Sequence, residues 1–243
     1  MSQKLISICI PTYNRPSQLK RMLESIDTTK VDDIDIVISE NCSPKQKETR
    51  KVVEEYRKTH PYEVHYFENE RNLGYDKNIR AAVARATGRF CVFFSDDDMA
   101  MPGALDEYIE FVRKHKDVGY ILRSYRNYSD SSETRWQDFY YYPTEREFPA
   151  GRDTAIELFN KSVFLSGFTI RQEYAKEYVT DRLMARCCIR CICCCRCAVA
   201  IHQPILAFWC QNLFLLVMTC IISEQVMVRR GIKMQQKWKE TTP

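Results

Sequence analysis

The chain has 243 residues, of which 45% are hydrophobic and 28% are charged, and its formal net charge is +4. These values fit one sizeable soluble domain with a well-filled core. They give no argument for a nucleic-acid partner, because the positive charge is confined to one end of the chain. Residues 181–243 hold nine Lys and Arg against three Asp and Glu, whereas residues 1–180 hold 27 against 29. The sequence runs from Met1 directly into a predicted strand without a signal peptide, so a cytoplasmic location is expected.

Strands alternate with helices through the first half of the sequence. Apolar runs predict strands at residues 5–10, 34–39, 64–67, 90–94 and 120–122. Apolar residues at helical spacing predict helices near residues 16–26, 43–56, 76–86 and 104–112. Ser43 to Gln46 is typical of a capping box, and Thr87-Gly88 of a helix end. The alternation predicts an α/β fold with right-handed βαβ units and a mostly parallel sheet.

Three acidic residues follow the strand at 90–94 directly: Asp96, Asp97 and Asp98. Open α/β sheets bind their ligands at the carboxyl ends of the strands, where the loops after Ile10 and Ser39 also lie. Carboxylates one residue apart can share a hard divalent cation, and a solvated acidic turn is the alternative. Neither G-x-G-x-x-G nor G-x-x-x-x-G-K follows the first strand, which argues against a Rossmann dehydrogenase or a P-loop enzyme.

Three segments together carry a family resemblance. They are Ile10-Pro11-Thr12-Tyr13-Asn14-Arg15, Arg71-Asn72-Leu73-Gly74 with Asn78 downstream, and Ser95-Asp96-Asp97-Asp98. In this order and spacing they resemble the nucleotide-sugar-binding half of family 2 glycosyltransferases, over about residues 4–125. The resemblance implies a GT-A fold, which is a Rossmann-like sandwich with a mostly parallel central sheet. It also implies a nucleoside diphosphate-sugar donor and a divalent cation, Mn²⁺ or Mg²⁺.

The same resemblance implies roles for individual residues. Asp98, together with Asp96, would hold the metal against the diphosphate, and Asp96 would face the ribose. The residues that would bind the nucleotide-sugar are Pro11, Thr12, Tyr13, Asn14, Arg15, Glu40, Arg71, Asn78, Asp96 and Asp97. Glu40 stands where the family usually has an Asp that contacts the base, which leaves the choice of nucleotide open. Packing of Tyr13 under its loop and a surface ion pair of Arg71 are the structural alternatives.

Residues 126–180 are expected to begin an acceptor half, with a helix at 154–160 and a strand at 163–170. The aromatic stretch from Tyr125 to Phe148 has two interpretations: a platform on which sugars stack, or a loop packed on the sheet. No residue can be assigned as the catalytic base. Asp138 and Asp181 are acids in the right half of the chain, without further support.

Residues 181–243 form an anomalous tail. Nine of the 12 cysteines lie between Cys187 and Cys220, in a pattern with no period of two or 3.6. The cysteines are too dense for a zinc site, and a disulfide framework conflicts with a cytoplasmic protein. A membrane segment at residues 205–222 is the third interpretation, interrupted by Gln211 and Asn212. The fourth is a change of reading frame near residues 180–186, because codons read one base earlier turn cysteines into leucines. We favour the fourth, and then the tail is not natively folded.

The sequence therefore predicts a glycosyltransferase domain at 1–180, with a donor half at 1–125 and the start of an acceptor half at 126–180. It would move a sugar from a nucleoside diphosphate-sugar to a glycan or lipid-linked acceptor in cell-surface polysaccharide synthesis. Peripheral association with the inner face of the membrane stays open. Two alternatives are a catalytically inactive nucleotide-sugar-binding remnant and, if the tail is genuine, a membrane-anchored transferase.

Overall fold

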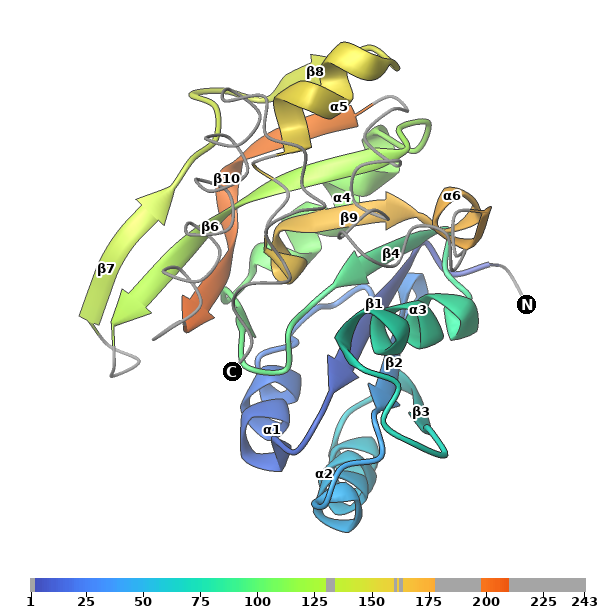
Figure 1. Ribbon diagram of the computed structural model, residues 1–243. Helices are drawn as coiled ribbons and strands as arrows, with labels where there is room; N and C mark the ends of the chain where they lie inside the picture. Colours follow the sequence, from blue (N-terminus) through green and yellow to red (C-terminus); the bar gives the residue numbers. More distant parts are fainter. Residues whose placement is uncertain (1–2, 130–133, 160, 162–163, 178–197, 210–243) are drawn as a thin grey trace, which may run out of the picture. The chain divides into compact units, whose positions relative to one another are not determined.

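The computed structural model describes residues 3–129, 134–159, 161, 164–177 and 198–209. The chain divides into two units, Met1–Trp209 and Cys210–Pro243, and every described residue belongs to the first. A ten-stranded sheet organises this unit (Figure 1). Its strands are β1 Ile6–Thr12, β2 Ile34–Glu40, β3 Glu63–Glu68, β4 Phe90–Phe93, β5 Met99–Ala100, β6 Tyr120–Ser129, β7 Thr134–Phe139, β8 Arg146–Phe148, β9 Phe168–Arg171 and β10 Ala198–Trp209.

The sheet is mostly parallel, as the sequence predicts. Its order is β3-β2-β1-β4-β9-β6-β10-β5, with β7 beside β6 and β8 beside β10. The pairs β3–β2, β2–β1, β1–β4 and β6–β10 are parallel. Strand β9 lies antiparallel to both β4 and β6, so these two neighbours again point the same way. A segment of the later half is therefore inserted between strands of the first half and β6.

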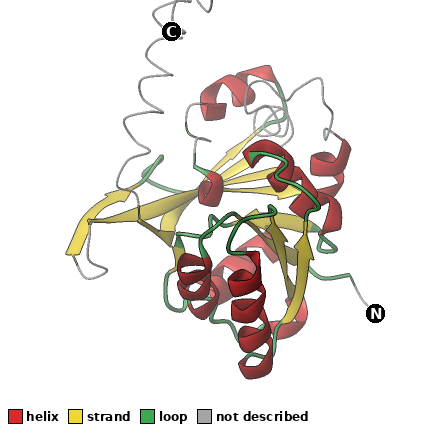
Figure 2. Ribbon diagram, turned by 60° about the horizontal axis from the view of Figure 1, so that its bottom comes forward, coloured by secondary structure: helices red, strands yellow, loops and turns green. Residues whose placement is uncertain are grey.

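Helices lie on both sides of the strands (Figure 2). They are α1 Pro16–Glu24, α2 Gln46–Thr59, α3 Tyr75–Arg85, α4 Ala104–Lys114, α5 Arg152–Phe159 and α6 Gln172–Glu177, with short 3-10 turns at Val31–Asp33 (η1) and Leu165–Gly167 (η2). One core cluster joins α3, α5 and α6 to Cys9, Val37 and Phe93 of the sheet. Since side chains alternate along a strand, Ile8 and Ile36 face the opposite side, where they are equally buried. Burial on both faces explains why these strands are continuous apolar runs.

Two local predictions are wrong. The capping box at Ser43 does not form: Lys45 is the residue before α2, and the Ser43 hydroxyl makes no hydrogen bond to a described residue. Gly88 does not end α3, which is followed by Ala86 in an extended conformation. Gly88 is required for another reason, because a Cβ there would lie 2.5 Å from the Ile6 carbonyl carbon and from the Ser7 nitrogen. The chain entering β4 thus passes directly against the start of β1.

The aromatic stretch from Tyr125 to Phe148 is not a loop. Residues of β6 and β7 pair antiparallel from Tyr125↔Phe139 to Ser129↔Thr134, and β8 follows. The predicted strand at 163–170 begins only at Phe168, after η2. Residues 198–209, which the sequence analysis placed in the tail, form β10. Residues 178–197 and 210–243, with the cysteine cluster and most of the predicted membrane segment, lie outside the described residues, so the boundary at 181 stays a prediction.

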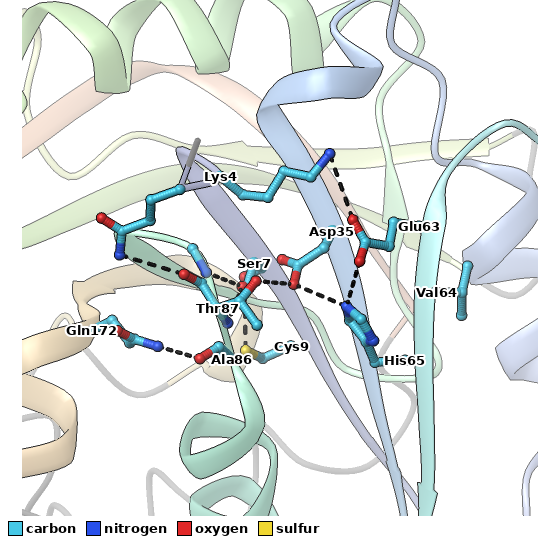
Figure 3. A network of polar contacts seen from close by, with 12 residues as sticks. Lys4, Ser7, Cys9, Asp35, Glu63, Val64, His65, Ala86, Thr87 and Gln172 are labelled. Carbon is cyan, nitrogen blue, oxygen red and sulfur yellow. Dashed lines mark hydrogen bonds and ion pairs between the residues drawn. The ribbon is translucent and has the colours of Figure 1, made fainter. Parts of the chain in front are cut away.

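A polar network occupies the amino ends of β1, β2 and β3 (Figure 3). The fully buried Asp35 accepts a 2.6 Å hydrogen bond from the Thr87 hydroxyl. Its Oδ2 lies 3.5 Å from His65 Nε2, which lies 3.2 Å from Glu63 Oε1, and Glu63 Oε2 is 3.7 Å from Lys4 Nζ. The contacts lead step by step from the buried carboxylate to the surface. They join the first residues of three strands to the segment before β4.

Candidate functional site

The candidate site lies at the carboxyl ends of β1, β2 and β4. Thr12 and Glu40 are the last residues of β1 and β2 and are paired in the sheet register. The Phe94 nitrogen bonds the Cys9 carbonyl, which continues the β1–β4 alignment past the end of β4. Asp96 to Asp98 follow in a turn closed by a 3.2 Å bond from the Asp98 nitrogen to the Ser95 carbonyl. The parallel register thus brings residues more than 80 positions apart to one edge, as predicted.

Asp96 is the central carboxylate of this edge. It is only 5% exposed, and its Oδ2 accepts a 2.7 Å hydrogen bond from the Thr12 hydroxyl. Burial raises the pKa of Asp96 to about 6, and the negative charge of Asp97 adds to this rise. The bond from Thr12 and the charge of Arg15 act in the opposite direction on this pKa. The negative charge of Asp96 is therefore in an unfavourable environment, and a positive ligand would stabilise it.

Arg15 supplies the positive charge that the site itself contains. Its Nη1 lies 2.6 Å from Asp97 Oδ2 and 3.3 Å from Asp96 Oδ1. The Ser95 hydroxyl donates to the other oxygen of Asp97. The Arg15 side chain is 48% exposed and that of Asp97 27%, so this pair forms the open side of the site. The carboxylates raise the pKa of Arg15, which keeps it charged.

Asp98 lies deeper and has a different partner. It is 1% exposed, and its Oδ2 accepts a hydrogen bond from the hydroxyl of Ser166. The same hydroxyl accepts a 2.7 Å bond from the backbone nitrogen of Ser95. Ser166 belongs to η2, in the later half of the chain. Sequence reasoning missed this residue, because a contact across 68 positions between a serine and an aspartate has no local signature.

Glu40 is buried and points toward the start of α2. Its Oε1 accepts a 3.0 Å bond from the Ser43 nitrogen, and its Oε2 a 3.0 Å bond from the Gln46 side chain. Neither bond comes from a backbone N–H of α2, so Glu40 closes the turn before the helix and does not cap it. Contact with a nucleotide base stays a prediction for Glu40, which would have to share its oxygens with these donors.

A buried amide network supports the loops. Asn78 donates to the carbonyls of Ser39 and Thr12 at 3.0 and 3.4 Å, and its oxygen accepts from Ser39 Oγ and Asn69 Nδ2 at 2.8 and 2.9 Å. Asn41 binds the 72–74 turn in the same way, through the Leu73 nitrogen at 2.8 Å. All four hydrogen-bonding positions of the Asn78 amide are filled. This favours a supporting role for Asn78 over contact with a ligand. No pattern in the sequence pointed to Asn69.

The remaining predicted residues differ in position. Pro11 is a buried residue of β1. Tyr13 is 44% exposed, so it does not pack under its loop. Asn14 has a φ of 60°, a conformation that Asn tolerates and that turns the chain from β1 into α1. Arg71 is exposed next to the turn bound by Asn41.

Of the two suggested bases, only Asp138 lies within the described residues, and its carboxylate is held by other side chains. Asp138 forms an ion pair with Arg126 across the β6–β7 hairpin, at 2.5 Å from Nε to Oδ1, and accepts a 3.0 Å bond from the Tyr140 hydroxyl. Asp181 lies outside the described residues. Of the aromatic stretch, Tyr140 is 45% exposed and Tyr142 is buried beside Phe148.

The donor set fits a divalent cation that takes further ligands from a substrate. Within the described ranges there is no group of three or more His, Cys, Asp and Glu that could hold a metal ion. Mg²⁺ and similar cations are usually bound by one or two carboxylates plus substrate phosphates and waters. Asp98 and Asp96 are two buried carboxylates one residue apart, which matches that requirement. Among the helices of the described chain, none is long and apolar enough to cross a membrane.

Curated proteins are similar to nearly half of this sequence. The chain is 40% identical over 116 residues to the abequosyltransferase RfbV of Salmonella typhimurium, which is 47% of this chain and 34% of that protein. It is 29% identical over 106 residues to the GalNAc(5)-diNAcBac-PP-undecaprenol beta-1,3-glucosyltransferase of Campylobacter jejuni, which is 43% of this chain and 33% of that protein. The chain thus spans about a third of the length of these relatives.

Solved structures share the fold. The S. aureus TarS 1–349 complex with UDP-GlcNAc superposes with a TM-score of 0.67 at 16% identity, over 86% of this chain and 59% of that one. The mannosyltransferase PcManGT of Pyrobaculum calidifontis, in complex with GDP-Man and Mn²⁺, gives a TM-score of 0.55 at 14% identity, over 88% and 59%. The expected GT-A arrangement is confirmed by this likeness. The family model of glycosyl transferase family 2 matches residues 7–179, which is more than half of the sequence and both sides of the β4–β9 pair. With its aspartates, Thr12 and Arg15 gathered at one sheet edge, the chain belongs to glycosyl transferase family 2.

Proposed function

We propose that this chain transfers a sugar from a nucleoside diphosphate-sugar to a glycan or lipid-linked acceptor in cell-surface polysaccharide synthesis. The proposal assigns Mn²⁺ or Mg²⁺ to Asp98 and Asp96, and the nucleotide to Thr12, Tyr13, Arg15 and the β2 end. Its relatives support the acceptor class, because one of them is named for an undecaprenol-linked glycan. The cytoplasmic location, with peripheral membrane association, is part of the same proposal.

One observation carries the proposal. Three consecutive carboxylates lie at the carboxyl end of β4, two of them at most 5% exposed, and Arg15, which pairs with Asp96 and Asp97, is half-exposed. Burying anions is costly, since a buried carboxylate needs a charged or hydrogen-bonding partner. A bound cation and a diphosphate would supply complementary charges. The position at the strand ends is where α/β proteins bind nucleotides.

The reaction follows from these charges. The acceptor hydroxyl oxygen forms a bond to the anomeric carbon, the bond from that carbon to the diphosphate oxygen breaks, and the hydroxyl proton passes to a base. Asp98 would hold a divalent cation, which would supply positive charge against the departing diphosphate. Arg15 is placed to add a positive charge on the open side of the same group. The base is unassigned, because Asp138 is held by Arg126.

The test is release of nucleoside diphosphate by the purified full chain. UDP-, GDP-, dTDP- and CDP-sugars are supplied in turn with Mn²⁺, and hydrolysis or transfer is read as free diphosphate. We expect release from one donor class, lost on adding EDTA and in the Asp98→Asn variant. Lys77→Gln, an exposed change on the outer surface of α3, is the matched control. Absence of both release and metal-dependent nucleotide binding would overturn the proposal.

The composition of residues 181–243 favours a second candidate, a remnant that binds donor and metal without transferring the sugar. A frame change near residues 180–186 would remove the acceptor half, including the base. Metal-dependent binding of UDP or GDP without diphosphate release would support it. Sequencing the coding DNA from the codon of Ser166 past the stop tests the cause: one inserted or deleted base should restore a frame without the cysteine cluster. If the DNA confirms the protein as written, the membrane-anchored form takes its place and should fractionate with membranes.

A further inference from the structure

The position of Ser166 beside Ser95 and Asp98 follows from the register of β4 and β9. Strands β4 and β9 pair antiparallel from Phe90↔Arg171 to Val92↔Thr169. Carrying this register on by three residues puts Ser166 opposite Ser95. The 2.7 Å bond from the Ser95 nitrogen to Ser166 Oγ is the continuation of the ladder by a side chain. The hydroxyl in turn donates a hydrogen bond to Asp98 Oδ2.

Arg123 holds the two strands together between these points. It is fully buried on β6, and its Nη2 donates 2.9 Å bonds to the carbonyls of both Phe93 and Phe168. These two residues are opposite each other in the same register, one step past the last backbone pair. The guanidinium also lies over the rings of Phe94 and Tyr108, 5.4 and 5.3 Å from their centroids. Arg123 of β6 therefore joins the end of β4 to the start of β9.

We propose that Ser166 is a positioning residue for the metal-binding carboxylate: it holds Asp98 in the orientation in which that carboxylate binds a divalent cation. The inference rests on the proposed function, which assigns the cation to Asp98. A carboxylate bonded through one oxygen is fixed in rotation and keeps lone pairs for a cation. Residues that bond to metal ligands in this way commonly change metal affinity when they are replaced. The donor half alone, residues 1–125, would lack this orientation.

The experiment uses Mn²⁺ as the probe, with saturating UDP and, in parallel, GDP. Free Mn²⁺ is measured by electron paramagnetic resonance on the full chain. We expect Ser166→Ala to weaken Mn²⁺ binding about tenfold. Ser166→Thr, which keeps the hydroxyl, should restore most of the affinity. Nucleotide binding in EDTA should stay within about twofold of wild type in both variants, since the hydrogen bonds of Ser166 go to Ser95 and Asp98 and not to the residues assigned to the nucleotide.

Thr169→Val is the matched control for stability. Thr169 is a buried residue of β9 whose hydroxyl bonds the Tyr108 hydroxyl, and not a carboxylate of the site. It should lower the thermal midpoint about as Ser166→Ala does, while its Mn²⁺ affinity stays within about twofold of wild type. A loss of affinity in both variants would reduce Ser166 to a structural role and overturn the inference.

The two proposals fail differently. If wild type binds Mn²⁺ and Asp98→Asn does not, while Ser166→Ala binds as well as wild type, only the role of Ser166 is overturned. If Asp98→Asn binds Mn²⁺ like wild type, or wild type does not bind it, the assignment of the metal fails and the inference fails with it.

Discussion

The two ends of the same strands each carry a buried carboxylate, with opposite arrangements. At the amino end, Asp35 is fully buried and accepts a hydrogen bond from Thr87. Its other contact is His65, which leads to Glu63 at the surface. At the carboxyl end, Asp96, Asp97 and Asp98 are consecutive, and their counter-charge is on the open side. Burial of a carboxylate alone therefore does not indicate a ligand site. A ligand site is indicated by adjacent acids with a displaceable partner, at the sheet edge where parallel sheets bind ligands.

The largest expected effect is a pH dependence at the carboxyl end. The pKa of Asp96 is about 6 in the folded, metal-free protein and lower in the unfolded chain. Between these values the folded state binds the proton more tightly, so the free energy of unfolding falls as pH rises from about 4 to about 6. We expect a fall of about 2 to 4 kcal/mol, which is absent in Asp96→Asn. Urea unfolding in EDTA across this range measures it, and equal slopes in both proteins would contradict it.

The next effect separates the two ends directly. Asp98→Asn should weaken Mn²⁺-dependent nucleotide binding about 100-fold, or about 2.7 kcal/mol, because a ligand carboxylate becomes neutral. Asp35→Asn removes an equally buried charge at the amino end and should leave this binding unchanged. Isothermal titration of both variants gives the comparison. A large loss of binding in Asp35→Asn would mean that the two networks are coupled.

Arg15→Ala should have a smaller effect, because its ion pairs are half-exposed. Arg15 lowers the pKa of Asp96, so its removal raises that pKa further. The stability that the protonated Asp96 contributes should then persist to higher pH than in wild type. The difference in the free energy of unfolding should stay within about 1 kcal/mol. The same urea series measures it, and a shift of the pH window toward acid would be the contrary result.

The smallest effect belongs to the surface end of the amino network. His65→Gln removes the contacts with Asp35 and Glu63, and we expect at most about 1 kcal/mol of destabilisation. Thermal unfolding in low and high salt should show the difference shrink as salt screens the exposed partner. A loss that does not respond to salt would place His65 with the buried structure and not with the surface.

Much of the first half could be predicted because its signals are local. Apolar runs predicted β1, β2 and β4, since both faces of these strands are buried. The three acids at the end of β4 predicted the position of the site. The partners that complete the site are different. Ser166 and Arg123 reach it from η2 and β6 through contacts that span 30 to 71 positions, and such contacts leave no pattern in the sequence.

The same distinction explains the errors. Strand β5 has only two residues and is defined by its pairing with β10, so no apolar run in the sequence predicts it. Neither interpretation of the aromatic stretch, a platform or a loop, predicted the pairing of β6 with β7. Before α2, Glu40 binds the Ser43 nitrogen and the Gln46 side chain, and the serine that fits the motif does not cap the helix. In each case a partner distant from the motif decided the structure.

The position of β9 also sets the order in which the protein can fold as it is synthesised. Phe90 of β4 pairs with Arg171 of β9, so one edge of β4 has no partner until that residue leaves the ribosome. At usual rates of synthesis this takes roughly 4 to 16 seconds after Phe90 emerges. During that time the growing chain presents an apolar, unpaired strand edge, which is a template for aggregation. A nascent chain released before residue 171 would keep the edge open, whereas one altered only after residue 180 would already have closed it.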